Sequence, residues 1–487
     1  MTVLQNIKNL ASDSLIYGVA GIATRLMGVL LTPLYTRVYT PEDYGVFGVV
    51  NNAYSLIALL MILSLDNSTA RWFYDSEEYE KRKRIISTWF WFYLILSALV
   101  GAFFFFSSNY WSQFVSYQPE LAGQYIQILA VSLPVSVATV VATKVLRFEK
   151  RPKSTVVLTF LQALSLILFN VLFVLVLDWG LTGAFYAKLV AGMIMVPLSI
   201  SYIKRWIGRF NLLDWTLLAK MIRYSLPFIP ASISIWMINL SAIFFLNGKV
   251  SDNDLGLFQV AFTLASFGGL IVNSFQQAWS PFAFSIIHQE NAKETYGKIL
   301  LVYLMVVGSL TLLISLFSLE ALMIIATPSY YGAAKIASIL VFSGMFAGLT
   351  NIADLGSAIS KKTAPLGMVY SFSAFLLIGL NILLIPEFGV IGAAFAVCFS
   401  QLVSPVFAFY FSQKVYPIPY DFIRAGVFVV LIFLMGYLGF YFSEPLSVFL
   451  SIGVKALAFI VFAALAICLF NREFLLARNL ILKRFKG

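Results

Sequence analysis

Residues 156–177 read VVLTFLQALSLILFNVLFVLVL, and none of these 22 side chains is ionisable. A helix needs about 20 apolar residues to cross the hydrocarbon core of a bilayer. A strand of a membrane β-barrel would instead alternate polar and apolar residues over about 10 positions, which this stretch does not do. The stretch therefore predicts a membrane-spanning helix.

The same composition extends through the chain of 487 residues, of which 60% are hydrophobic and 11% are charged. Soluble proteins carry about 25% charged residues, and disordered proteins lack such apolar runs. Cys398 and Cys468 lie inside apolar runs, and His288 is the one histidine, so we expect no disulfide, no metal site and no cofactor. The sequence predicts an all-α, polytopic membrane protein.

Apolar runs, and the polar or helix-breaking residues between them, predict fourteen membrane helices with short connections. None of the connections is long enough to fold as a separate domain. The predicted helices lie at 12–37, 43–66, 85–107, 122–144, 155–177, 181–203, 222–247, 254–280, 298–319, 333–359, 364–385, 390–413, 421–442 and 447–470.

Basic residues are concentrated in alternate loops. One side of the membrane receives the run 81–84, the cluster 144–153 and the tail 472–486, whereas the other side receives at most Arg37, Lys249 and Lys335. Since basic loops stay in the cytoplasm, both termini are predicted to be cytoplasmic. The net charge of +11 therefore reflects topology and attraction to anionic membrane lipids, and we do not expect nucleic acid as a partner.

Two segments of the chain resemble each other: residues 179–192 read WGLTGAFYAKLVAG and residues 388–401 read FGVIGAAFAVCFSQ. Further matches lie 211 positions apart, such as PEDYGVF at 41–47 with DNDLGLF at 252–258. We predict two six-helix lobes, 1–212 and 213–419, followed by a helix pair and a basic tail at 420–487. Because each copy has an even number of helices, the two copies cross the membrane in the same direction, as parallel repeats do.

The repeated segments carry small residues four positions apart. They are Gly183, Ala187 and Ala191 in the first copy, and Gly392, Ala396 and Ser400 in the second. Small residues at this spacing let helix backbones approach closely in lipid. We therefore expect these segments to serve helix packing, after tight turns at 179–180 and 388–389.

The pattern of helix 1 followed by PEDYGVFG at 41–48 resembles bacterial polysaccharide transporters of the Wzx type. So does the pattern of Lys362, then Asn381 to Leu384, then Gly389 to Ala393 in the second copy. Those transporters belong to the superfamily that includes the multidrug extrusion (MATE) proteins and the lipid II flippase MurJ. The resemblance covers essentially the whole chain and implies two six-helix lobes around a central cavity that opens alternately to either face.

The resemblance also implies a cargo and a location. The cargo would be an oligosaccharide on undecaprenyl pyrophosphate, as in O-antigen, capsule or exopolysaccharide synthesis, and the membrane would be the bacterial inner membrane. The glycan would cross through the cavity while the polyprenyl tail stays in lipid. A glycan polymerase and a chain-length regulator are expected partners, and a proton or sodium gradient is the expected source of energy.

Polar residues form stripes on helices 1, 2, 7 and 8, which are equivalent pairs in the two copies. Arg25 lies near the centre of helix 1, where inserting a charge costs about 2.5–3.5 kcal/mol. We expect Arg25 to line a watery lumen and to attract a pyrophosphate or an acidic sugar. The alternative is a structural ion pair with Asp66 or Asp354.

Arg25 is one of eight predicted lumen residues, and two carboxylates are candidates for ion coupling. For the cations, snorkelling to the membrane surface is an open alternative, and for the uncharged residues ordinary helix packing is. The lumen residues are Arg25, Arg37, Arg71, Lys188, Lys249, Asn239, Asn273 and Gln276; the carboxylates are Asp66 and Asp354.

Three other functions remain as alternatives. A multidrug or cation antiporter on the same fold would need inward carboxylates, whereas the most central charge here belongs to Arg25. A membrane enzyme would need ionisable residues on large external loops, and loops such as 107–120 are short and nearly uncharged, so we do not expect an enzyme. A channel or passive scramblase would not depend on an ion gradient.

Overall fold

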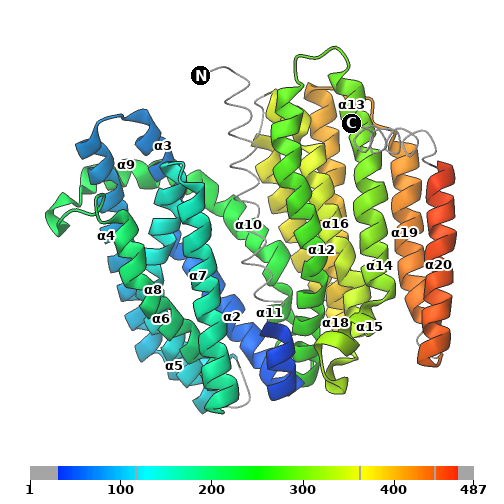
Figure 1. The fold of residues 1–487 in the computed structure, drawn as a ribbon, viewed down its shortest axis with the longest axis horizontal. Coiled ribbons are helices and arrows are strands. Elements are labelled where there is room, and N and C mark those ends of the chain that lie inside the picture. Colours follow the sequence, from blue (N-terminus) through cyan, green and yellow to red (C-terminus); the bar gives the residue numbers. More distant parts are fainter. Residues whose placement is uncertain (1–30, 116–118, 361–363, 444–445, 470–487) are drawn as a thin grey trace. The chain divides into compact units, whose positions relative to one another are not determined.

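The computed structural model describes residues 31–115, 119–360, 364–443 and 446–469, and within these ranges it contains helices and no strand (Figure 1). The chain divides into two compact units, residues 1–259 and 260–487. The division falls inside α12 (Asp252–Ser285). The predicted lobe limits at residues 212 and 419 follow the sequence repeat and stay predictions.

Unit 1 holds the helices of the first copy and the first helix of the second. Several membrane helices are built from two shorter pieces. The elements are α2 (Pro41–Ile62), α3 (Leu65–Asp75), α4 (Tyr79–Phe106), α5 (Ser108–Ser112), α6 (Pro119–Phe148), α7 (Pro152–Asn170), η1 (Val171–Val176), α8 (Gly180–Ile203), η2 (Phe210–Leu212), α9 (Trp215–Ser225), η3 (Leu226–Phe228), α10 (Ile229–Leu240) and α11 (Ala242–Leu246).

Unit 2 is arranged around α16 (Ala333–Ala353), whose span is 78% buried. The unit has further elements besides α12. They are α13 (Ala292–Tyr303), η4 (Leu304–Gly308), α14 (Ser309–Leu316), α15 (Ser318–Ile325), η5 (Pro328–Tyr330), α17 (Leu355–Ile359), α18 (Ala364–Val415), α19 (Phe422–Ser443) and α20 (Val448–Leu469).

Twelve helices among the described residues are long and apolar enough to cross a membrane. One of them, 367–415, has 49 residues, and a straight helix of that length would measure about 73 Å against a hydrocarbon core of about 30 Å. It bends at Gly389, where φ is 52°, so it forms two spans. These findings confirm the predicted polytopic helical fold; most of the predicted helix 12–37 lies outside the described residues.

The surface of α7 shows why the chain needs a membrane. Phe160, Leu164 and Leu168 are 39–57% exposed along one side of this helix, whereas Thr155 and Asn170 are fully buried. Large apolar side chains on the outside and small or amide side chains on the inside reverse the pattern of a soluble helix. The exposed stripe is therefore matched to lipid.

The second membrane helix is broken in its middle. Leu63 and Ser64 have φ values of 50° and 52°, a left-handed backbone that is unusual for residues other than glycine. The Ser225 hydroxyl, at the end of α9, donates a hydrogen bond of 3.0 Å to the Ser64 carbonyl oxygen. The predicted helix 43–66 is therefore two helices that together extend to Asp75, because a neighbouring segment stabilises the break.

The turns before the two repeated segments have the predicted geometry. Gly180 and Gly389 have φ values of 54° and 52°, which glycine adopts without strain. A Cβ atom on Gly183 would lie 2.9 Å from the Phe173 carbonyl oxygen, and one on Gly392 would crowd the Leu384 carbonyl in the same way. The close helix approach predicted for both small-residue segments is confirmed.

The starts of α2 and α12 are capped in the same way. The Thr40 hydroxyl accepts a hydrogen bond from the Asp43 backbone N–H, and the Thr40 backbone N–H donates to the Asp43 carboxylate. At the equivalent positions of the second copy, Ser251 accepts from the Asp254 backbone N–H and donates its hydroxyl to the Asp254 carboxylate. This shared N-terminal cap explains why the sequence repeat is strongest here.

The same two helix starts contact each other through equivalent residues. The Asn253 side-chain amide donates a hydrogen bond of 3.2 Å to Glu42, and these two residues are 211 positions apart. A residue that meets its own equivalent lies beside a twofold axis. The facing pairs are Glu42 with Asn253, Gly45 with Gly256, and Gly48 with Gln259.

Replacing Gly256 by alanine will test this close contact. A Cβ atom at this position would overlap the backbone carbonyl of Pro41, which cannot move aside as a side chain could. We expect the free energy of unfolding in detergent to fall by about 1–3 kcal/mol, the usual effect of overpacking. In the control Gly426→Ala, no atom lies within 4 Å of the new methyl group, so stability should not change. Equal stability of both variants would contradict the contact.

Candidate functional site

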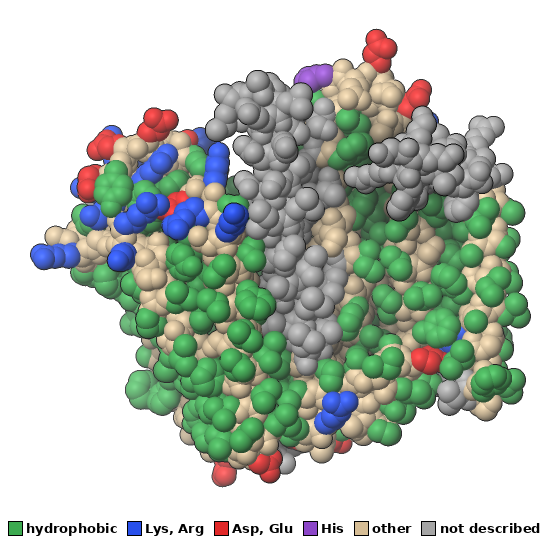
Figure 2. Space-filling view, viewed as in Figure 1, with side chains coloured by type: hydrophobic (Ala, Val, Ile, Leu, Met, Phe, Trp, Pro, Cys, Tyr) green, Lys and Arg blue, Asp and Glu red, His purple; other side chains and the backbone are tan. Residues whose placement is uncertain are grey.

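The basic loops of unit 1 lie together at one end of its helices. Lys and Arg side chains gather over α3, α4 and α9 in Figure 2. The Tyr74 hydroxyl donates to the Phe148 carbonyl oxygen at 3.0 Å, and the Glu149 carboxylate, 5% exposed, pairs with Arg205 and Arg151. These contacts join loops that are far apart in sequence. The alternate loops that carry the basic residues therefore lie together at one end of unit 1.

Three of the predicted lumen cations are exposed in the structure. Arg37 and Lys249 are exposed at the ends of their helices. Arg71 is exposed on α3, where its guanidinium lies 3.5 Å from the Asp75 carboxylate and 5.4 Å from the centre of the Tyr224 ring. Arg25 lies outside the described residues, so its lumen position stays a prediction from sequence.

Lys188 is the predicted cation that the structure places inside a unit. It follows the start of α8 by eight residues, and its ammonium donates a hydrogen bond of 3.0 Å to the Asn51 side-chain oxygen on α2. The same ammonium lies 3.8 Å from the centre of the Tyr54 ring, a cation–π contact. No carboxylate of the described residues forms an ion pair with it, so Lys188 is a half-buried cation without a counter-charge there.

A cavity of about 380 Å³ adjoins the Lys188 amine; it is called the polar cavity here for its Lys188, Asn51 and Gln162 side chains, although apolar side chains form most of its wall. Its walls come from the segment at 31–35 and from α2, α7 and α8. Besides Lys188 it is lined by the amides of Asn51 and Gln162 and by the Thr159 hydroxyl. Ammonium, amide and hydroxyl groups together suit an anionic or hydroxyl-rich ligand.

The two candidate ion-coupling carboxylates differ in their surroundings. Asp66, at the start of α3, forms an ion pair of 2.5 Å with Lys144 on α6. Asp354, at the end of α16, is half-buried, and no side chain of the described ranges forms an ion pair with it. Asp66 is thus paired with Lys144, whereas Asp354 has no ion-pair partner among the described residues.

The predicted polar residues of unit 2 are arranged around Asn351. The Gln276 amide donates a hydrogen bond of 2.9 Å to the Asn351 side-chain oxygen, and the Trp279 indole N–H donates to the Asn351 carbonyl oxygen. Asn273 donates to the Gly269 carbonyl of its own helix. In unit 1, the exposed Asn239 likewise donates to the Ile235 carbonyl of its own helix. These bonds use part of the hydrogen-bonding capacity of each side-chain amide. The assignment of these residues to the lumen stays a prediction.

The polar stripes of helices 2 and 7 meet each other within unit 1. The Trp236 indole N–H donates a hydrogen bond of 2.9 Å to the Ser55 hydroxyl, and the Ser64 and Ser232 hydroxyls lie 3.4 Å apart. Side-chain hydrogen bonds of this kind hold membrane helices together. These members of the stripes therefore serve packing in this conformation.

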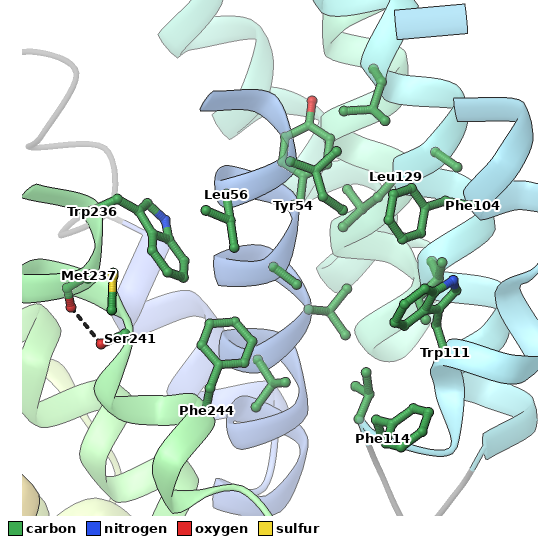
Figure 3. Close-up of a pocket in the computed structure, with 18 of the residues that line it drawn as sticks. Tyr54, Leu56, Phe104, Trp111, Phe114, Leu129, Trp236, Met237, Ser241 and Phe244 are labelled. Carbon is green, nitrogen blue, oxygen red and sulfur yellow. Dashed lines mark hydrogen bonds between the residues drawn. The ribbon is translucent and has the colours of Figure 1, made fainter. Parts of the chain in front are cut away.

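Unit 1 also contains an apolar cavity of about 590 Å³ (Figure 3). Rings from five elements surround it: Tyr54, Phe104, Trp111, Phe114, Trp236 and Phe244. The polar groups in the lining are already paired, since Ser241 donates to the Met237 carbonyl and the Trp111 and Trp236 indoles donate to serines. An apolar cavity of even about 150 Å³ stays dry and admits apolar guests. This cavity therefore suits hydrocarbon and excludes sugar.

A buried ion pair was not predicted. Lys455 on α20 is 1% exposed, and its ammonium lies 2.7 and 2.9 Å from the two carboxylate oxygens of Glu320 on α15. The structure buries Lys455 inside unit 2. Among the described residues, no three His, Cys, Asp or Glu side chains come together as a metal site requires.

Sequence reasoning missed Asn51 and Tyr54, the two residues that hold the Lys188 ammonium. Neither residue was among the predicted lumen residues, although Asn51 lies in the first half of α2. Tyr54 follows Asn51 by three residues and thus lies on the same side of α2. An Asn-x-x-Tyr pair on one membrane helix and a lone lysine on another would have been the available signal.

A family model described as "polysaccharide biosynthesis protein" matches residues 10–287, more than half of the chain. The capsular polysaccharide biosynthesis protein CapF of Staphylococcus aureus is 29% identical over 168 residues, which are 33% of this chain and 42% of that protein. An uncharacterized membrane protein of Methanocaldococcus jannaschii is 33% identical over 123 residues, 25% of this chain and 24% of that protein. The matches thus span less than half of each relative.

Solved structures share the fold over most of the chain. The lipid II flippase MurJ, in an inward closed conformation, aligns with a TM-score of 0.72 and 12% identity over 95% of this chain and all of that one. An inward-facing multidrug resistance MATE family transporter of the MOP superfamily aligns with a TM-score of 0.66 and 15% identity over 83% of this chain and 95% of that one. At these identities the likeness shows the fold.

Proposed function

We propose a function from one premise: the chain belongs to the polysaccharide biosynthesis protein family. It is a multi-pass membrane protein with the fold of the MOP superfamily transporters. In our proposal it carries an undecaprenyl-pyrophosphate-linked oligosaccharide from the inner to the outer leaflet of a bacterial cytoplasmic membrane. The repeat unit would serve O-antigen, capsule or exopolysaccharide synthesis.

The observation that carries this proposal is the Lys188 amine beside a polar cavity within the membrane helices. A sugar headgroup with phosphate charges cannot cross bare hydrocarbon, because each polar group would lose its hydration without a partner. The amine and the amides around the cavity offer charge-assisted hydrogen bonds that replace this hydration. The cation and the amides in this wall therefore favour an anionic glycolipid as cargo.

The proposed movement is rocking of the two repeats about the axis on which equivalent residues face each other. The contact between α2 and the start of α12 lies at the end of unit 1 opposite to the basic loops. With the basic loops in the cytoplasm, this contact would close the outer side while cargo enters from the inner side. Both termini would then be cytoplasmic, and a glycan polymerase and a chain-length regulator would act on the product outside.

A flipping assay tests the proposal directly. Purified protein in liposomes should expose a lipid-linked oligosaccharide, loaded in the inner leaflet, to an enzyme added outside, and liposomes without protein should not. A proton or sodium gradient should accelerate the movement if Asp66 or Asp354 couples it to an ion. An unchanged leaflet distribution in protein-containing liposomes would contradict the function.

Lys188→Met is expected to slow flipping by about tenfold or more, because a charge-assisted hydrogen bond contributes about 1.5–3 kcal/mol. Lys188→Arg should retain most activity, since it preserves the positive charge next to Asn51 and Tyr54. Initial rates in the liposome assay, at equal amounts of inserted protein, give the comparison. A Lys188→Met variant as fast as the wild type would remove this residue from the transport path.

A multidrug or cation antiporter on the same fold is the rival function. Cationic drugs need an unpaired carboxylate; Asp66 in unit 1 is paired with Lys144, which leaves the half-buried Asp354 of unit 2 as the candidate for that function. A deletion strain would then become sensitive to cationic drugs without accumulating lipid-linked glycan inside. The opposite result, glycan accumulation without drug sensitivity, is expected from our proposal.

A further inference from the structure

The apolar cavity of unit 1 has no role in moving a sugar headgroup, and it is larger than the polar cavity beside Lys188. It measures about 590 Å³ against about 380 Å³. Its lining offers no unpaired donor among Trp111, Trp236 and Ser241, each of which bonds to the protein itself. A ligand for this cavity must be hydrocarbon.

One side chain lies between the apolar cavity and the Lys188 ammonium. Tyr54 contributes its ring to the wall of the apolar cavity, and the Lys188 ammonium lies 3.8 Å from the centre of that ring. A positive charge and a large apolar space thus lie next to each other across a single side chain. This pairing complements an amphiphile whose hydrocarbon chain begins at an anionic group.

We propose that the apolar cavity binds the first part of the polyprenyl chain of the lipid-linked substrate, with the attached phosphate toward Lys188. The proposal rests on the proposed function and places the chain inside the protein, where the sequence had left it in lipid. A polyprenyl chain carries a methyl branch and a planar double bond in every unit, so it is wider than an acyl chain. The six rings around the cavity offer flat apolar surfaces to those double bonds.

Small side chains keep the cavity open. Ala53 on α2 and Ala130 on α6 lie in the lining among the rings. A larger side chain at residue 53 would take up space in the cavity without removing a hydrogen bond. Ala53→Phe is therefore a filling variant that leaves Lys188 and Asn51 in place.

A matched control exists on α4. Ala98 lines a second cavity of about 340 Å³, together with Phe105, Phe106 and Val131; its wall shares Ala130 with the first cavity. Ala98→Phe makes the same substitution in a second apolar cavity that does not contact Tyr54 or Lys188. It controls for the general effect of adding a ring to a membrane helix.

The first experiment measures binding of undecaprenyl phosphate, which has the chain and one phosphate but no sugar, to the purified protein by native mass spectrometry. We expect Ala53→Phe to weaken binding at least tenfold and Ala98→Phe to leave it unchanged. Phosphatidylglycerol, an anionic lipid with acyl chains, should compete poorly. Binding unaffected by Ala53→Phe, or equal displacement by phosphatidylglycerol, would overturn the proposal.

The second experiment does not depend on how the variants fold. A polyprenyl phosphate with a photoreactive diazirine near the phosphate end should label α2, α6 or α10 of the wild-type protein. Labelling confined to other helices would place the chain elsewhere and overturn the proposal. If the wild type flips lipid-linked glycan but is labelled elsewhere, the proposed function stands and the cavity assignment fails. If the wild type does not flip glycan, the proposed function itself fails.

Discussion

A cross-link between residues 42 and 253 will stop transport, and its removal will restore it. The Glu42 and Asn253 side chains are within 3.2 Å of each other, at the contact where the two repeats meet through equivalent residues. Rocking must separate α2 from α12 at this end whenever the outer side opens. Glu42→Cys and Asn253→Cys, joined by a short bis-methanethiosulfonate reagent, should therefore abolish flipping in liposomes, and a reducing agent should recover it.

The controls separate locking from general damage. The native thiols of Cys398 and Cys468 are free and are first replaced by serine. Thr139 and Ser199, with hydroxyl groups 3.1 Å apart on α6 and α8, belong to the same repeat, so cross-linked cysteines there should leave transport intact. Each single cysteine should also be active after treatment. Full activity of the cross-linked 42–253 pair would rule out separation at this contact.

Lys455→Met is expected to lower the free energy of unfolding by about 3–5 kcal/mol, the largest effect on stability among these variants. The substitution leaves the Glu320 carboxylate, 18% exposed, without its partner inside unit 2. An unpaired buried charge has lost its hydration without gaining an ion pair or hydrogen bonds that compensate for the loss. The free energy of unfolding is measured in mixed micelles, with the separation of α19 and α20 from the rest of unit 2 as the signal.

The double variant Lys455→Met/Glu320→Leu distinguishes this explanation from simple loss of packing. Replacing both charges by apolar side chains should restore stability to within about 1 kcal/mol of the wild type, because no unpaired charge remains. Lys81→Met is the comparison, since its partner Glu78 is 58% exposed and stays hydrated without the lysine. A Lys455→Met variant as stable as Lys81→Met would contradict the assignment of a buried pair.

Much of the fold follows from sequence because lipid imposes simple rules. Uninterrupted apolar runs such as 156–177 must form helices that satisfy their own backbone groups. The glycines at 180, 183, 389 and 392 are visible in the sequence, and each has the turn or close approach that only glycine allows. The repeat could be recognised because both copies need these same local features.

Other features could not be predicted because they depend on distant residues. The break at Leu63 and Ser64 has no glycine or proline to announce it, and it is stabilised by Ser225, more than 150 positions away. Glu320 and Lys455 are separated by 135 positions. Sequence periodicity places each residue on a side of its helix but does not identify the neighbouring helix.

The candidate site shows the same division. Lys188 was recognised because a lysine in a membrane helix is costly and therefore rare. Its partners, Asn51 and Tyr54, and the apolar cavity beyond Tyr54 result from the packing of several helices and have no local signal. A cavity is an absence of side chains, so no residue type in the sequence marks it.

The contact of equivalent residues has a consequence for the origin of the chain. A half-length ancestor that dimerised about this axis would have placed every residue here against its own copy, so two glutamines at the position of Gly48 and Gln259 would have collided. In a single chain that carries both copies, this constraint is absent. One copy could keep glycine while the other gained a long side chain, and Glu42 and Asn253 could diverge into a donor and an acceptor. The unlike residues that face each other, Glu42 with Asn253 and Gly48 with Gln259, are possible because the contact no longer has to be self-complementary.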